Sequence, residues 1–137
     1  MSFKGLVYPF YTRDAPVDMM AAAEVISGDC YGLNAVPEPD KLKNVLDVGA
    51  HIGSFTCFLK QLYPDVDVYS FEPMVDSFKI LEANTFRLTG VHLFNKAFWI
   101  DDGAGVIHVN PTNNGGNTMS EIHVRYGYDV EIGRAHV

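Results

Sequence analysis

The pattern of apolar and polar positions is most regular between residues 44 and 72. Residues 45–48 form a short apolar run that predicts a strand buried on both faces. The next segment changes to helical spacing, with one apolar stripe made by Phe55, Phe58, Leu59 and Leu62. Pro64 ends this helix, and residues 66–71 read as a second buried strand. The order strand, helix, strand predicts a βαβ unit with parallel strands.

Flanking segments extend the pattern on both sides. Residues 3–11 are rich in aromatic side chains and form either an edge strand or an extended arm. Residues 16–26 predict a helix, with Asp14 as a candidate cap. The apolar side of this helix either covers the crevice at the strand ends or packs on the sheet. Residues 75–85 predict another helix, and residues 91–94 a third strand. The apolar stripes of these two helices are Met19, Met20, Ala23 and Ile26, and Val75, Phe78, Leu81 and Thr85.

Together these elements predict an α/β protein with the N-terminal half of a Rossmann-like fold. Its parallel strands have the order 3-2-1 and are followed by a β-hairpin, in which residues 98–100 and 106–109 flank an Asp-Gly turn. Residues 1–130 are expected to form one incomplete domain. Its parts are an arm and helix (1–40), a βαβαβ core (44–98), and a hairpin and loop (98–126).

Composition limits the class of protein. A chain of 137 residues, 47% hydrophobic and 20% charged, fits one globular domain. The net charge of −7 disfavours a nucleic-acid partner, and the lack of a run of 18 apolar residues predicts no membrane span. Cys30 and Cys57 form neither a metal-binding spacing nor a disulfide framework, which predicts a reducing, cytoplasmic setting. His92, His108 and His123 match no ligand spacing, so no metal site is predicted.

Candidate chemistry gathers where the first two predicted strands end. Gly49 and Gly53 bracket a tight turn in which glycine lets a ligand approach the backbone. Glu72 follows the second strand, where a carboxylate can accept hydrogen bonds from both hydroxyls of a ribose. These features predict a nucleoside-containing cofactor; the alternative is an ordinary turn beside a solvated strand end. Asp47 and the missing middle glycine of G-x-G-x-x-G disfavour a pyrophosphate and favour a cofactor with a cationic amine and sulfonium.

The sequence D-x-G-x-x-x-G followed by F-E-P resembles class I S-adenosylmethionine-dependent methyltransferases. More closely, residues 30–118 resemble the FkbM-type methyltransferase family through the segments VLDVGAHIGSFT, FEPMVDSFKILEAN, VHLFNKAFW and NNGGNT. The resemblance implies S-adenosyl-L-methionine as methyl donor and a small-molecule or glycan acceptor, methylated on a hydroxyl of a sugar or natural product. His51 stands where the family more often carries Asn, and a neutral imidazole can still donate one hydrogen bond.

The resemblance also implies which residues hold the cofactor. The amine of the donor would lie near Asp47, its carboxylate would face the amides of residues 49–53, and its ribose would bind Glu72. Asn95 either borders the adenine or is an ordinary turn residue, and Tyr31 either lines the cofactor pocket or is a buried packing residue. The expected cofactor-binding residues are Tyr31, Asp47, Gly49, Ala50, His51, Gly53, Glu72, Pro73, Asn95 and Ala97.

The C-terminal part of the chain departs from the family pattern. The next motif, a strand with an acidic K-I-D-x-E-G-like segment, is absent, so no catalytic residue is identified. Residues 131–137 read like a translated sequencing adapter, and we expect them to have no evolved role. A chain cut near residue 130 leaves the strand 45–48 at an exposed edge, which predicts association through that edge and weak or no activity. The alternatives to a methyltransferase are an NAD(P)-dependent Rossmann oxidoreductase and a non-catalytic fragment or binding module.

Overall fold

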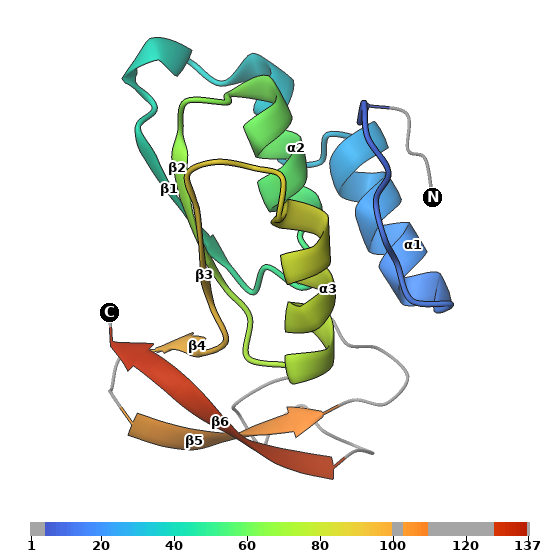
Figure 1. Ribbon diagram of the computed structural model, residues 1–137, viewed down its shortest axis with the longest axis vertical. Coiled ribbons are helices and arrows are strands. Elements are labelled where there is room, and N and C mark those ends of the chain that lie inside the picture. Colours follow the sequence, from blue (N-terminus) through green and yellow to red (C-terminus); the bar gives the residue numbers. More distant parts are fainter. Residues whose placement is uncertain (1–4, 100–102, 110–127, 137) are drawn as a thin grey trace.

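A computed structural model describes residues 5–99, 103–109 and 128–136 (Figure 1). The helices and strands are α1 (Pro16–Ala22), η1 (Ala23–Ser27), η2 (Leu33–Ala35), η3 (Pro39–Lys41), β1 (Asn44–Val48), α2 (Ser54–Leu62), β2 (Asp67–Phe71), α3 (Val75–Thr85), β3 (Val91–Phe94), β4 (Ala97–Trp99), β5 (Gly103–Val109) and β6 (Tyr128–His136). η1 is π-helical, whereas η2 and η3 are 3₁₀-helical. Within the described ranges, no helix has the length and hydropathy of a membrane-spanning segment.

The first three strands form one parallel sheet in the order β1-β2-β3. This topology, with α2 and α3 as its crossovers, confirms the predicted strand order and the Rossmann-like fold. The register sets Val48 opposite Phe71, and Phe71 opposite Phe94. The three strands therefore end level, and the residues that follow them lie along one rim of the sheet.

α2 and α3 cover one face of this sheet, and α1 lies beyond them on the outer side (Figure 1). α2 ends before Pro64, as predicted, and it is buried on two sides because the sheet packs on one and the N-terminal segments on the other. Cys57, Phe58 and Leu59 are at most 3% exposed. The core therefore lies around α2.

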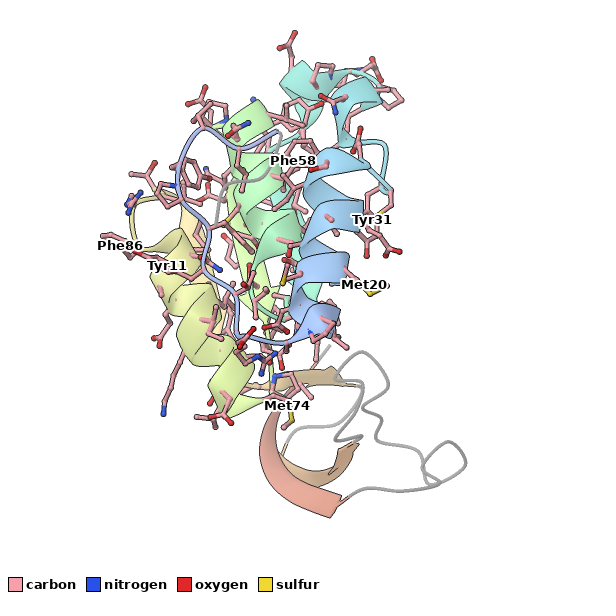
Figure 2. All side chains as sticks on the ribbon, turned by 90° about the vertical axis from the view of Figure 1, so that its right-hand side faces the viewer. Tyr11, Met20, Tyr31, Phe58, Met74 and Phe86 are labelled. Atoms are coloured by element: carbon pink, nitrogen blue, oxygen red, sulfur yellow. The ribbon has the colours of Figure 1, made fainter. Side chains whose placement is uncertain are left out.

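Of the apolar stripe predicted for residues 16–26, Ile26 is buried as expected, whereas Met19, Met20 and Ala23 are exposed. Met20 points away from the other helices (Figure 2) and is 65% exposed, whereas Ala22 and Ile26 are buried. α1 cannot reach the sheet, because α2 and α3 already cover that face. The helix cap is Ala15, which makes no side-chain hydrogen bond, so the prediction of Asp14 as cap is wrong.

Residues 5–15 form an extended arm and contain no strand, which decides between the two alternatives. The arm passes between α1 and α3 on the outer side of α2 (Figure 2). Asn84 of α3 holds it, because its Oδ1 accepts the N–H of Tyr11 (2.7 Å) and its Nδ2 donates to the carbonyl of Tyr11 (2.9 Å). Leu81 and Thr85 of the predicted stripe are buried, whereas Val75 is 51% exposed. The buried residues of α3 are Ser77, Leu81, Asn84 and Thr85.

The opposite face of the sheet carries no helix among the described residues (Figure 1). Leu46 and Val48 are 56% and 55% exposed, so the prediction that β1 is buried on both faces is wrong. The physical reason is that both crossover helices lie on the same face, which leaves one face of β1 open. β1 is also at the edge of the described sheet. Association through that edge stays a prediction.

The strands β4, β5 and β6 form a second sheet in the order β4-β6-β5. β6 pairs parallel with β4 and antiparallel with β5, so the predicted hairpin between residues 98–100 and 106–109 is wrong. The seven residues of β5 all pair with β6, a longer ladder than the three-residue β4 offers. Residues 131–136 belong to β6, and their adapter origin stays a prediction. The expected turn covers residues 101–105, but residues 103–105 belong to β5. Residues 101–102 and the segment 113–118 lie outside the described residues.

Candidate functional site

The level ends of the strands bring three predicted site residues together. Gly49, Glu72 and Asn95 each directly follow the last residue of β1, β2 and β3. The N–H of Gly49 donates to the carbonyl of Phe71 (2.9 Å), and the N–H of Glu72 donates to the carbonyl of Phe94 (3.0 Å). The Nδ2 of Asn95 donates to the carbonyl of Glu72 (2.8 Å). The rim is therefore built by hydrogen bonds from one strand end to the next.

The turn of residues 49–53 holds three residues in left-handed conformation. Their φ angles are 77° for Gly49, 52° for His51 and 94° for Gly53. A Cβ on Gly49 would meet no atom within 4 Å, so the space beside this part of the turn is open. A Cβ on Gly53 would lie 2.9 Å from Cδ1 of Leu81, so glycine there lets α3 pack closely. Gly49 therefore leaves the turn open to an approaching ligand, whereas Gly53 allows α3 to pack closely against the turn.

Most N–H groups of this turn already have acceptors inside the protein. Those of Gly49 and Ala50 donate to the carbonyl of Phe71 (2.9 Å each), and that of Gly53 donates to the carbonyl of Ala50 (2.9 Å). The resemblance assigns a cofactor carboxylate to these N–H groups, but their hydrogens are already donated within the protein. By contrast, the first turn of α2 has no side-chain cap, so its N–H groups and the positive end of the helix are the available anion-binding features.

Glu72 connects the turn to the start of α3. Its Oε2 accepts the N–H of His51 and its Oε1 accepts the N–H of Met74, both at 2.8 Å. The residue is 6% exposed. Burial raises the pKa of Glu72 and the nearby charge of Asp47 raises it further, while the two N–H donors and Arg13 oppose the rise. Each carboxylate oxygen keeps a second lone pair for an additional donor.

Asp47 lies on the side of β1 that faces α2. Its Oδ2 accepts the hydroxyl of Thr56 (2.6 Å), and this hydroxyl is 2.7 Å from the hydroxyl of Ser70. The residue is 8% exposed, and burial raises the pKa of Asp47 to about 6 in spite of the hydrogen bonds from Thr56. The described part of the chain places no cation against this carboxylate. The site therefore holds two neighbouring buried carboxyl groups.

The remaining predicted residues have different surroundings. Pro73 is half-buried, and its carbonyl accepts the Nδ2 of Asn95 (3.2 Å). Ala97 is buried within β4. Tyr31 is 65% exposed, so it is not the buried packing residue of the second alternative, and its ring meets that of Phe55 edge to face at 5.2 Å. A place for Tyr31 in the cofactor pocket stays a prediction.

The structure adds a cluster that the sequence does not indicate, made by Arg13, Asp18 and His51. Arg13 forms an ion pair with the buried Asp18 (2.8 Å), and its guanidinium lies 3.0 Å from Nε2 of His51. The only sequence signal is an acidic residue in the first turn of a helix, which ordinarily complements the helix dipole. Across the described residues, no group of three or more His, Cys, Asp or Glu side chains is arranged to hold a metal ion.

The chain is similar to proteins named as methyltransferases. It is 26% identical over 98 residues to Methyltransferase 1 of Beauveria bassiana (strain ARSEF 2860), a match that covers 70% of this chain and 38% of that protein. The chain thus spans less than two fifths of that relative's length. Similar solved structures include StiE O-MT (TM-score 0.49, 16% identity, 63% of this chain and 32% of that chain). Another is coclaurine N-methyltransferase bound to N-methylheliamine and SAH (TM-score 0.42, 19% identity, 63% and 25%). No protein-family model matches the chain.

Proposed function

We propose that the chain binds S-adenosylmethionine and is part of an FkbM-type methyltransferase that methylates a hydroxyl of a sugar or natural product. The observation that carries the proposal is the common rim on which Gly49, Glu72 and Asn95 follow three level strand ends. The similarity to Methyltransferase 1 of Beauveria bassiana supports the reaction class. The free cysteines Cys30 and Cys57 support a reducing, cytoplasmic setting.

The charge of the site favours this cofactor over a nicotinamide dinucleotide. Burial raises the pKa values of Asp47 and Glu72, which means that the protein surroundings compensate their negative charges only in part. S-adenosylmethionine carries an ammonium and a sulfonium, and either cation would stabilise the ionised carboxylates. The pyrophosphate of NAD would instead add negative charge to the same crevice.

Each part of the cofactor has a proposed partner. The free lone pairs of Glu72 would accept the ribose hydroxyls, Asp47 would attract the amine, and Asn95 would lie beside the adenine. The first turn of α2 would bind the carboxylate, because the N–H groups of the preceding turn already have acceptors. When bound, the cofactor supplies an electrophilic methyl group, and the protein orients the acceptor oxygen toward it. No catalytic base is assigned.

The binding test uses titration calorimetry of the chain with S-adenosylhomocysteine and with NADH. We expect S-adenosylhomocysteine to bind and NADH to bind at least about tenfold more weakly, because it lacks a cation for the buried carboxylates. Tighter binding of NADH would contradict the proposal and favour the oxidoreductase. Glu72→Gln should lower the affinity for S-adenosylhomocysteine by about tenfold or more, the usual loss for a hydrogen bond to a charged group.

A matched control for Glu72→Gln is Asp67→Asn, at the opposite end of β2. It removes one carboxylate from the same strand but away from the rim, so the affinity should stay within about twofold. Thermal unfolding of both variants separates a binding loss from a folding loss. A loss under about threefold for a folded Glu72→Gln protein would count against the ribose role.

Methyl transfer is tested on the chain and on a version extended by the C-terminal half of a related protein. We expect turnover of hydroxylated acceptors only in the extended protein. Equal turnover by both would show that the added half is dispensable. Binding of S-adenosylhomocysteine without turnover by either would favour the non-catalytic binding module.

A further inference from the structure

A buried carboxylate away from the rim joins the N-terminal arm to the glycine turn. Asp18, in α1, is 0% exposed. Its Oδ2 accepts the backbone N–H of Arg13 (3.1 Å) and its Nε (2.8 Å), and its Oδ1 accepts a terminal guanidinium nitrogen (2.8 Å). Burial alone would raise the pKa of Asp18, but these hydrogen bonds hold it below its usual range. The carboxylate is therefore charged and fixes the guanidinium in one orientation.

The oriented guanidinium reaches the ring of His51. The distance from the terminal nitrogen of Arg13 to Nε2 is 3.0 Å. The same Nε2 lies 3.2 Å from Oδ1 of Asp18, so the ring contacts both members of the ion pair. Burial lowers the pKa of His51, whereas the charge of Asp18 raises it and that of Arg13 lowers it. Asp18 thus acts on His51 both directly and through Arg13.

The backbone of His51 is where this cluster meets the rim. With a φ of 52°, His51 adopts a left-handed conformation that is unfavourable for a residue with a Cβ. In that conformation its N–H reaches Oε2 of Glu72 at 2.8 Å. A contact that holds the ring in place also holds this N–H in place. The chain of contacts from Asp18 to Arg13 to His51 therefore ends on the carboxylate of Glu72.

We propose that Asp18 and Arg13 are positioning residues of the cofactor site, which hold His51 in the conformation from which its N–H fixes Glu72. The effect on cofactor affinity rests on the proposed function, in which Glu72 binds the ribose. The effect on the His51 backbone rests on the contacts alone.

The competing explanation is that the ion pair only fastens the arm to the protein. The chain offers a control for this, because Gln61 of α2 fastens the same arm at its other end. The Oε1 of Gln61 accepts the N–H of Val7 (2.8 Å), and its Nε2 donates to the carbonyl of Gly5. Gln61→Ala therefore loosens the arm without touching the turn.

The experiment compares Asp18→Asn, Arg13→Lys and Gln61→Ala with the unchanged chain. Arg13→Lys keeps the positive charge beside Asp18 but lacks the planar fork that contacts Asp18 and His51 together, so it carries the test if Asp18→Asn does not fold. Two quantities are measured: the affinity for S-adenosylhomocysteine by calorimetry and the hydrogen-exchange rate of the His51 amide by NMR. Thermal unfolding gives the loss of stability of each variant.

We expect the Asp18 and Arg13 variants to weaken binding by about tenfold and to speed His51 exchange by about tenfold or more, the loss expected for charge-assisted hydrogen bonds. Gln61→Ala should leave both within about twofold after correction for stability. Equal effects of all three variants at equal stability would overturn the proposal. If the unchanged chain does not bind S-adenosylhomocysteine, the proposed function fails, and the exchange rates still decide whether Asp18 and Arg13 position His51.

Discussion

Ionisation of the buried carboxyl group of Asp47 lowers the free energy of unfolding of the free protein near neutral pH. Its pKa is raised from 3.8 to about 6 by burial. When the pKa of a group is higher in the folded than in the unfolded state, protonation of that group stabilises the folded state, and this contribution is fully present below the unfolded pKa. That stabilisation is lost as the pH rises through the folded pKa. At about 1.4 kcal/mol for each pKa unit, the total loss above pH 6 is about 3 kcal/mol.

Asp47→Asn removes this titration while its amide oxygen can still accept the hydroxyl of Thr56. We expect the variant to be more stable than the unchanged chain near neutral pH. The stability difference between the two should grow by about 1.4 kcal/mol from pH 5 to pH 7.5. The same variant should bind S-adenosylhomocysteine more weakly, because it lacks the carboxylate that we propose attracts the ammonium.

The assay is urea unfolding at both pH values, with Glu82→Gln on the exposed side of α3 as the control for loss of one carboxylate. The titration of His51 occurs in both proteins and largely cancels in the difference. Asp47→Asn also removes the charge that raises the pKa of Glu72, so it stabilises that carboxylate as well. A stability difference that does not change with pH, or a gain equal to that of Glu82→Gln, would refute the argument that Asp47 is buried without a compensating charge.

Further variants test the packing. Leu59→Ala should lower the free energy of unfolding by about 3–5 kcal/mol and Leu46→Ala by under about 1 kcal/mol, because Leu59 is 1% and Leu46 is 56% exposed. Equal losses in urea unfolding would show that the open face of β1 is covered in solution. Gly53→Ala should cost about 2 kcal/mol and Gly49→Ala about 1 kcal/mol, since only at Gly53 would the new Cβ clash with α3; the reverse order would contradict this packing. Asn84→Ala removes three hydrogen bonds and should cost about 2–3 kcal/mol. Limited proteolysis should then cut the arm, and an arm as resistant as before would contradict its role as clamp.

The sequence alone predicted the central fold because its signals are local. The apolar run of β1, the helical stripe of α2 and Pro64 after it lie within one continuous segment, and each acts over a few residues. Parallel strands joined by helices must end at the same edge, so the meeting of Gly49, Glu72 and Asn95 followed from topology alone. These three residues could therefore be placed together without a structure.

Features that depend on packing between distant segments could not be predicted in this way. The exposure of Leu46 follows from both crossover helices lying on one face, which hydrophobic spacing does not encode. The wrong hairpin has a similar cause, since β6 supplies a longer ladder to β5 than the neighbouring β4 does. Periodicity predicts that a segment is a strand, but its partner depends on the whole set of available edges.

The sequence by itself determined the central βαβ unit, the glycine turn and the carboxylate beside it, because residue type and spacing fix these within a few turns of chain. Only the tertiary structure decided which N–H groups of the turn are occupied and that Arg13 and Asp18 both contact His51. Arg13 and His51 are separated by 38 residues, and their contact exists only because α1 and the arm pack against α2. Such contacts form from the summed burial of many side chains, and no local pattern records them.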